Sequence, residues 1–520
     1  MVTSPHPLAT QAGVDVLKKG GNAIEAAVAT AATLTVVMPH FCGLGGDAVW
    51  LVADREGRRA SLLGIGQAAT RLPDLSSPIP LRGAGSTLTT ACAVDSWDHA
   101  LRYAARHWSQ SFDIRDLLRT AIDLAENGYR PTRSQTFWLE FRASEIDAWR
   151  GFSDVFDHRR KSGPFCQPEL ASVLRQMQAD GLRSFYDGPL ARRIAEGLAD
   201  AGSPLRLADL AATATREEMP LSIVYRGLTL LAPPPPTQGL STLSILGILQ
   251  NFDLKNMPGG RTDRIHLLVE AVKQAFLDRD TIADPDGSDI DYSERLEPDH
   301  LAERAGRIDM HAAMPWPHAH RHGDTVFFAV TDRDGRSASV LQSTYFDWGS
   351  GTVIGDTGIL WQNRGAAFST RSGHPNVAAP GKRPFYTLNP GIALKQDRPH
   401  LLYGTQGADG QPQTLAVVLT ALIDGQMTPE QALAEPRFLL GKTFSDARDS
   451  LKLEASMGCG TQQELERRGH SVVELPALSP LFGQAGVIRI EDDGSLSGAH
   501  DPRGEGVALP ARAPADRLGA

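Results

Sequence analysis

The sequence contains little cysteine and no cysteine pair at a metal-binding or redox spacing. Its four cysteines, Cys42, Cys92, Cys166 and Cys459, are far apart in a chain of 520 residues. The missing CxxC spacing argues against a zinc ribbon or a dithiol centre, and a chain of this length can build its core without disulfides. We therefore expect four free, buried thiols.

Long apolar runs and runs of basic residues are also missing. The most apolar stretch, residues 26–38, is too short to cross a bilayer, and no small-residue cleavage site follows it before Pro39. The formal net charge is −9, and no Lys/Arg-rich run offers a groove for nucleic acid. We expect a cytoplasmic protein that binds neither membranes nor nucleic acids and carries no targeting segment.

Three familiar motifs are absent or incomplete. The sequence has no GxSxG elbow, so a serine α/β-hydrolase would lack its nucleophile. Residues 64–69, GIGQAA, imitate a dinucleotide fingerprint, but Pro73 falls where the helix should continue. His318, His320 and His322 have neither an HExxH motif nor a carboxylate cluster beside them. The sequence therefore predicts no cofactor and no metal, and a solvated His-rich loop.

The hydrophobic pattern predicts grouped helices and strands. Asn22 and Glu25 have the spacing of a capping box, and the following helix, residues 26–37, is apolar on all sides and must be buried. Residues 95–202 are mostly helical in pattern, and the segment 280–323 is predicted to be a long irregular connection. Further helices are expected at 241–249, 263–279, 413–423, 428–434 and 460–469, and strands at 48–53, 59–63, 326–331, 337–343, 391–395, 400–403 and 486–490. This grouping predicts an α+β fold.

Blocks spread over nearly the whole chain resemble the γ-glutamyltranspeptidase family of N-terminal-nucleophile hydrolases. They occur in family order at residues 6–31, 39–50, 264–280, 323–353, 358–369, 379–390 and 403–414. The first reads HPLATQAGVDVLKKGGNAIEAAVATA, the second PHFCGLGGDAVW, and the last YGTQGADGQPQT. The block WQNRGAAF is also similar to the branch that contains glutaryl (cephalosporin) acylases and oxamate amidohydrolase.

The resemblance implies self-cleavage. Family members are cut before a threonine that opens a Thr-Thr-His-x-Ser-Val-x-Asp run, and the matching run here, TVFFAVTD, begins at Thr325. The expected products are a large chain, residues 1–324, and a small chain, residues 325–520, which together form one four-layer αββα sandwich. Such a heterodimer can pair further. Without the resemblance, Thr325 would be read as an ordinary strand residue.

The resemblance also implies the catalytic groups. Thr325 is expected to attack the carbonyl of Asp324 and, after cleavage, to act as nucleophile with its own freed α-amine as base, since such an amine titrates near neutral pH. A Gly-Gly pair whose backbone N–H groups bind the oxyanion in the family corresponds to Gly407 and Ala408. Ala408 keeps the N–H but needs a compatible φ. Ser343 takes the place of a threonine that hydrogen-bonds near the nucleophile.

The chain departs from the family where glutathione-using members bind the glutamyl group. The family holds the α-amine with Asn, Gln or Glu, and Asp, whereas the matching residues here are Tyr345, Arg364 and Ala367. An ammonium beside Arg364 would be poorly placed, but a carboxylate would suit its guanidinium. We therefore expect a small substrate amide with a terminal acid and no α-amine, such as oxamate or a glutaryl amide.

The family's carboxylate-binding residues differ as well. The large-chain arginine falls near Ile65 or Gly66 here, and the Ser-Ser pair is replaced by Tyr386 and Thr387. Only residues 368–381 separate the blocks that flank the lid of other members, so a short or absent lid and an open site are expected.

Two alternatives to this function remain. The chain could be a true γ-glutamyl hydrolase or transferase with an unusual binding site, or a scaffold protein that keeps the fold and is not processed. Arg364 could also form a structural ion pair instead of binding substrate.

Overall fold

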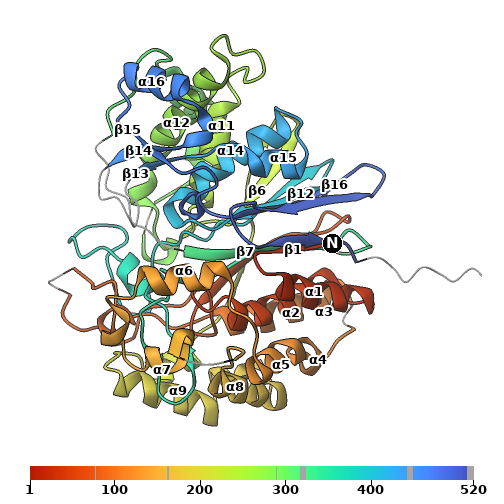
Figure 1. Cartoon of the computed structure of the whole chain (residues 1–520), viewed down its shortest axis with the longest axis vertical. Helices are drawn as coiled ribbons and strands as arrows, with labels where there is room; N and C mark the ends of the chain where they lie inside the picture. The colour runs from red at the N-terminus through yellow and green to blue at the C-terminus, as the bar shows by residue number, and fades with distance from the viewer. Residues whose placement is uncertain are drawn as a thin grey trace, which may run out of the picture.

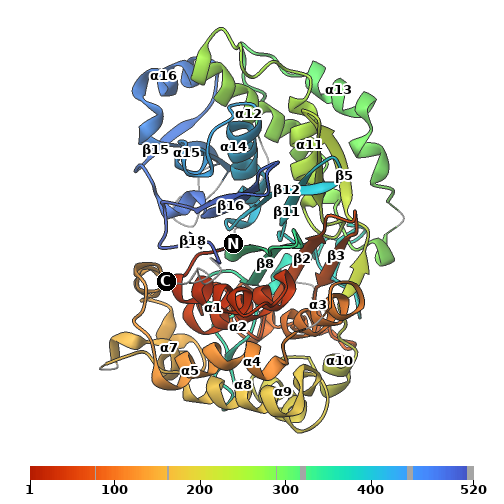
Figure 2. The same ribbon diagram turned by 90° about the vertical axis from the view of Figure 1, so that its right-hand side faces the viewer.

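Two antiparallel sheets lie face to face in the computed structural model, and helices cover the outer face of each (Figures 1 and 2). The structure describes residues 1–75, 78–109, 111–160, 163–288, 290–316, 324–441 and 449–511. The predicted α+β class and αββα layering are confirmed.

The first sheet places the expected nucleophile near its centre. Its seven strands are, in spatial order, β18 (Val507–Leu509), β1 (Val2–Ser4), β7 (Asp324–Thr331), β8 (Ser337–Tyr345), β2 (Asp47–Ala53), β3 (Arg59–Gly64) and β4 (Arg216–Glu218). β7 thus lies between β1 and β8, with β18 from the C-terminal end beyond β1. The hairpins predicted around residues 48–63 and 326–343 are confirmed.

The second sheet has six strands. In spatial order they are β17 (Leu496–His500), β16 (Ala485–Ile490), β12 (Arg398–Thr405), β11 (Gly391–Lys395), β6 (Leu228–Ala232) and β5 (Leu221–Tyr225). The space between the sheets is filled by buried apolar side chains of both, among them Val49, Leu51, Phe327, Leu341, Ile392, Leu402 and Ile488. Each such side chain contributes about 1.5–3 kcal/mol of burial free energy, which holds the two sheets together.

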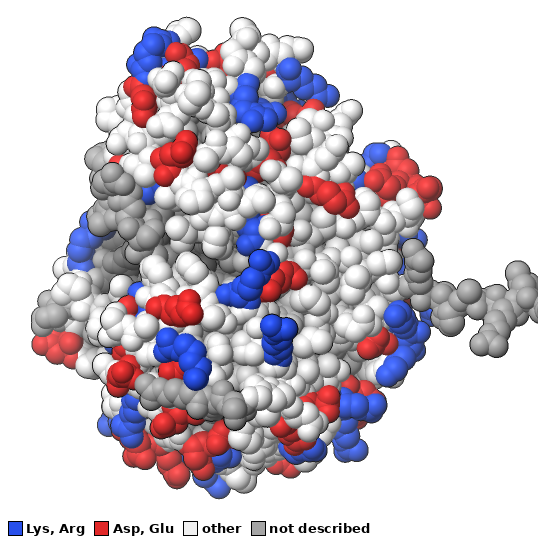
Figure 3. All heavy atoms as spheres, in the orientation of Figure 1, with Lys and Arg blue, Asp and Glu red and all other residues white. Residues whose placement is uncertain are grey.

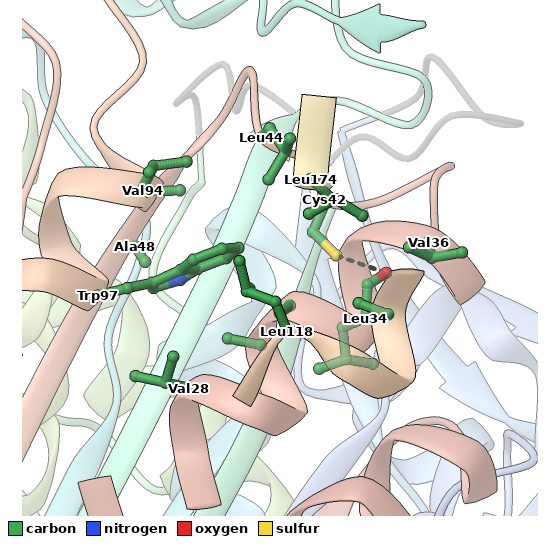
Figure 4. Packing of buried hydrophobic residues seen from close by; sticks show 14 of the residues in the cluster. Val28, Leu34, Val36, Cys42, Leu44, Ala48, Val94, Trp97, Leu118 and Leu174 are labelled. Carbon is green, nitrogen blue, oxygen red and sulfur yellow. Dashed lines mark hydrogen bonds between the residues drawn. The ribbon is translucent and has the colours of Figure 1, made fainter. Parts of the chain in front are cut away.

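The helical layer on the first sheet is formed by the N-terminal part of the chain. Its helices are α1 (Pro7–Lys18), α2 (Ala23–Val37), α3 (Ala93–His107), α4 (Ile114–Leu117), α5 (Arg119–Asn127), α6 (Arg133–Phe141), α7 (Phe152–Phe156), α8 (Pro168–Asp180), α9 (Pro189–Asp200) and α10 (Leu207–Ala211). Figure 4 shows Val28 and Leu34 of α2 near Trp97 of α3, Leu174 of α8, and Leu118 between α4 and α5.

Helix α2 has the predicted start and the predicted burial. The Asn22 side chain accepts hydrogen bonds from the N–H of Ile24 and Glu25, at 2.9 and 3.0 Å, and Glu25 Oε2 accepts one from the N–H of Asn22 at 2.8 Å. All 15 residues of the helix are buried. Because it is covered on every side, its uniformly apolar sequence is explained.

The helical layer on the second sheet contains α11 (Gly239–Leu249), α12 (Gly260–Phe276), α13 (Pro298–Gly306), α14 (Gln411–Ile423), α15 (Pro429–Ala434) and α16 (Cys459–Arg467). Two small sheets complete the chain, one of β9 (Val353–Ile354) and β10 (Ile359–Leu360), the other of β13 (Phe438–Gly441), β14 (Ser450–Glu454) and β15 (Val472–Leu475). The segment predicted to be irregular, 280–323, contains α13, which begins at Pro298 and buries Leu301 and Ala305. That part of the prediction is wrong because two apolar residues four apart are enough for a short helix to pack.

The prediction for the cysteines is only partly right. All four thiols are free, and Cys42 and Cys92 are buried, but Cys166 is half-buried and Cys459 is exposed. Cys42 donates to the carbonyl of Leu34 at 3.3 Å (Figure 4). In the described part of the chain no helix combines the length and apolar character needed to span a bilayer. Basic and acidic side chains are interspersed over the face in Figure 3.

Candidate active site

Thr325 is the second residue of β7 and lies at a bulge. Asp324 pairs with Tyr345 and Val326 pairs with Gln342, so Ser343 and Thr344 of β8 both lie opposite Thr325. Bulges of this kind redirect side chains and are frequent at active sites. Thr325 is 1% exposed, and its Oγ1 has no hydrogen-bond partner among the residues that the structure describes. A buried hydroxyl without a partner is uncommon and leaves this oxygen available for chemistry.

Ser343 lies across the β7–β8 bulge from Thr325. Its Oγ accepts a hydrogen bond from the N–H of Tyr345 at 2.8 Å, and its backbone pairs with Asp47 of β2. Asp47 is buried, and its Oδ1 accepts from the N–H groups of Cys92 and Gly66 at 2.7 and 3.1 Å. Burial raises the pKa of this carboxyl to about 7. The sequence analysis did not identify Asp47, which follows the turn GLGG without any distinguishing spacing.

Gly407 and Ala408 connect β12 to α14 in the left-handed region. Their φ angles are 117° and 42°, so Ala408 adopts the conformation that its expected role requires. The Gly407 carbonyl accepts from the N–H of Gly410 at 2.7 Å, and the Ala408 carbonyl accepts from Gln238 Nε2 at 2.7 Å. Among the described residues, neither Gly407 nor Ala408 donates its own N–H to a protein acceptor. The two N–H groups are thus available to an oxyanion.

Arg364 lies between two tyrosine rings in the interior. Its guanidinium carbon is 3.7 Å from the ring centre of Tyr345 and 4.0 Å from that of Tyr386. The residue is 1% exposed, and its closest polar contact is from Nη1 to Thr387 Oγ1 at 3.4 Å. The structure therefore brings together all four residues that were predicted to bind substrate.

The Arg364 guanidinium has unused donors. Among the described residues, its buried Nε and Nη2 have no hydrogen-bond partner, and no carboxylate forms an ion pair with it. Burial lowers the pKa of Arg364 to about 10, while Tyr345, Asp47 and Asp409 partly oppose that shift. The alternative of a structural ion pair is thus wrong for the described part of the chain. A buried cation without a paired anion is costly, and a ligand carboxylate would satisfy it.

The loop around Ile65 and Gly66 has no arginine at the position that binds the substrate carboxylate in other members of the family. A Cβ on Gly66 would lie 1.7 Å from the carbonyl oxygen of Thr90, so only glycine fits there. Residues 65–69 form an extended loop with a bridge from Ala68 to Thr89, and no helix follows them.

The site is closed in the continuous chain. Thr325 and Arg364 are each 1% exposed, although residues 368–381 form only a short connection. The expectation that a short lid leaves the site open is therefore wrong for this uncleaved form. His318, His320 and His322 lie outside the described residues.

A separate buried group, His266, Glu270 and His470, has its ligand atoms within 4.8 Å of one another. His266 Nε2 lies 2.8 Å from the Asp309 carbonyl and must donate to it, so His266 Nδ1 accepts from His470 Nε2, also at 2.8 Å. Lys273 Nζ donates to Glu270 Oε1 at 2.7 Å. Because these atoms already satisfy one another, we interpret the group as an anchor for the segment that leads toward Thr325.

Comparisons with known proteins give matches over nearly the whole chain. Residues 9–511 match the family described as Gamma-glutamyltranspeptidase. The chain is 41% identical over 518 residues to an oxamate amidohydrolase proenzyme of Klebsiella pneumoniae, covering 98% of both chains. It is 39% identical over 519 residues to a glutathione hydrolase-like proenzyme of Bacillus subtilis, with the same coverage. A cephalosporin acylase structure from Bacillus halodurans superposes with a TM-score of 0.88 at 31% identity, over 97% of this chain and 94% of that one.

Proposed function

The chain belongs to the γ-glutamyltranspeptidase family and is an N-terminal-nucleophile amidohydrolase, and from this premise we propose that it processes itself at Thr325 and hydrolyses a small carboxylate-bearing amide. Oxamate-type and glutaryl-type amides are the substrate classes in question. The site residues and the two-chain division given above are part of this proposal.

Processing begins with the uncleaved chain. Thr325 Oγ1 attacks the carbonyl carbon of Asp324, the peptide C–N bond breaks, and the acyl group moves from nitrogen to oxygen. Water then hydrolyses this ester, which leaves a carboxylate on Asp324 and a free α-amine on Thr325. The Oγ1 at the β8 bulge supports the assignment, because no group in the described part of the chain forms a hydrogen bond with it.

Substrate hydrolysis uses the new amine as a base. The α-amine accepts the proton of Thr325 Oγ1 as the oxygen attacks the substrate carbonyl, and the resulting oxyanion accepts from the N–H groups of Gly407 and Ala408. The amine then passes the proton to the leaving nitrogen, and an acyl-Thr325 ester remains. Water hydrolyses this ester and restores the hydroxyl. Ser343 is proposed to hold the strand geometry beside the nucleophile, through its hydrogen bond to the N–H of Tyr345.

The observation that carries the substrate class is that Nε and Nη2 of Arg364 have no hydrogen-bond partner among the described residues. Tyr345 and Tyr386 hold the guanidinium flat between their rings, so its Nε and Nη2 edge keeps a fixed direction. A planar fork of this kind matches a carboxylate by two parallel hydrogen bonds and repels an ammonium. This supports an acyl group that ends in an acid and has no α-amine.

One relative is named a glutathione hydrolase-like proenzyme, so γ-glutamyl compounds are the competing substrate class. Purified protein should be assayed with oxamate, glutaryl-p-nitroanilide and γ-glutamyl-p-nitroanilide at equal concentrations. We expect kcat/KM to be highest for one of the two compounds without an α-amine. A clear preference for the γ-glutamyl compound would contradict the role of Arg364, and a single uncleaved band without activity would support a scaffold protein.

A further inference from the structure

Gln238 links the two halves of the candidate site from behind. Its side-chain Nε2 donates to the carbonyl of Ala408 and to the carbonyl of Thr387, both at 2.7 Å. Its backbone N–H donates to the carbonyl of Tyr386 at 2.8 Å. Gln238 is completely buried and precedes α11, directly after the proline run at residues 233–236. One residue thus contacts both the oxyanion loop and the segment that carries Tyr386 and Thr387.

The orientation of the Gln238 amide is determined by its partners. Two carbonyl oxygens can only accept, so the NH2 group must face Thr387 and Ala408. The amide oxygen faces Arg279, whose Nη2 and Nε donate to it at 3.0 and 3.3 Å. Arg279 also pairs with Asp409, the residue after Ala408. All the hydrogen-bonding capacity of the amide is therefore used, and the side chain has one stable position.

These contacts determine where the Ala408 N–H points. The peptide before the Ala408 Cα is held by the hydrogen bond from Gly410 to the Gly407 carbonyl. The peptide after it is held by Gln238 and by the N–H of Gln411, which both donate to the Ala408 carbonyl. Ala408 has a φ of 42°, which an alanine adopts only at a cost of about 1–2 kcal/mol. The Ala408 carbonyl also accepts from the N–H of Gln411, so loss of Gln238 would remove one of its two hydrogen bonds and weaken the hold on this strained backbone.

We propose that Gln238 is a positioning residue for the oxyanion hole, and that it acts through the Ala408 carbonyl with Arg279 as its support. The inference rests on the proposed function, in which the Gly407 and Ala408 N–H groups bind the oxyanion. Gln238 and Arg279 belong to residues 1–324, whereas Thr387 and Ala408 belong to residues 325–520. After cleavage, the large chain would hold the catalytic loop of the small chain in place.

The test compares Gln238→Met and Gln238→Asn with Gln274→Met. Methionine keeps the length and removes both donors, while asparagine is too short to reach both carbonyls. Gln274 is a matched control, because it is a buried glutamine of α12 whose amide, among the described residues, forms a hydrogen bond only with the sulfur of Met314, at 3.3 Å. Processing is followed by intact mass, and kcat and KM are measured with whichever of the three acyl donors the wild type hydrolyses fastest.

We expect Gln238→Met to be cleaved normally and to lose about 10- to 100-fold in kcat, since removing one oxyanion donor outright costs about 10²–10³-fold. KM should change less than threefold, Gln238→Asn should be intermediate, and Gln274→Met should match the wild type. A processed Gln238→Met with kcat within twofold of the wild type would overturn the inference, as would a rise in KM alone.

Loss of cleavage in both Gln238 variants, but not in Gln274→Met, would also overturn it, because Gln238 would then serve maturation. Failure of the proposed function is seen separately, in the wild type itself. It would appear as an uncleaved chain or as preference for the γ-glutamyl donor.

Discussion

Replacing Arg364 by methionine should change activity and stability in opposite directions. The guanidinium is 1% exposed, lies between the rings of Tyr345 and Tyr386, and leaves Nε and Nη2 without partners. Methionine fills the same elongated space and packs well against aromatic rings. The variant therefore removes the charge and the donors while keeping most of the packing.

The size of the activity loss follows from the two unused donors. A bound carboxylate would accept two charge-assisted hydrogen bonds, each contributing about 1.5–3 kcal/mol, so the variant should lose about 10²- to 10⁴-fold in kcat/KM for an acidic amide. In the free protein the same substitution removes a buried, unpaired cation, so the free energy of unfolding should increase by roughly 1–3 kcal/mol. Burial lowers the pKa of Arg364 to about 10, which agrees with such a cost.

The assay compares glutaryl-p-nitroanilide with butyryl-p-nitroanilide, which has the same carbon chain without the acid. The ratio of their kcat/KM values isolates the carboxylate, because both share the nucleophile and the oxyanion hole. Arg383→Met is the matched control, since Arg383 is also buried but forms an ion pair with Asp284 at 2.6 Å. It should lower the melting temperature and leave the ratio unchanged. An unchanged ratio in Arg364→Met would refute the proposed contact with the substrate acid.

Two further predictions concern the oxyanion loop and acid stability. Gly407→Ala should lower kcat by about 10- to 100-fold, because a φ of 117° is unfavourable for an L-residue. The kcat of Ala408→Gly should stay within about threefold of the wild type. Steady-state kinetics of the two variants test this, and equal losses of kcat would contradict it. Burial lowers the pKa of His6 and His500 to about 4, so the unfolded chain takes up these protons at higher pH than the folded one. The contribution of these neutral histidines to the free energy of unfolding should be fully present above pH 6.5. It should fall as pH decreases toward 4, by up to about 2 kcal/mol per histidine at pH 5. Urea unfolding of the wild type and of His500→Gln at several pH values measures this, and a free energy of unfolding that does not change between pH 7 and pH 5 would contradict it.

Local patterns in the sequence were sufficient for much of the fold. The capping box at Asn22 and Glu25 and the all-apolar turns after it specify both the start and the burial of α2. The β2–β3 and β7–β8 hairpins follow from alternation and turn residues. Helix α13 was missed because it has only two buried apolar residues within a polar segment.

The candidate site could not be found from local pattern at all. A threonine that opens a strand is ordinary, and Thr325 stood out only through the family resemblance. The bulge opposite it depends on the register of β8, which no short window of sequence specifies. Gln238 was missed for a similar reason: its partners at Thr387 and Ala408 are 149 and 170 residues away in the chain.

The most direct test of the central claim is the intact mass of the purified protein, together with the N-terminal sequence of the smaller product. The account predicts two chains in the wild type, the smaller one beginning at Thr325, and one uncleaved, inactive chain in Thr325→Ala. A fully active wild type that remains a single chain, or a cut at a different bond, would contradict it.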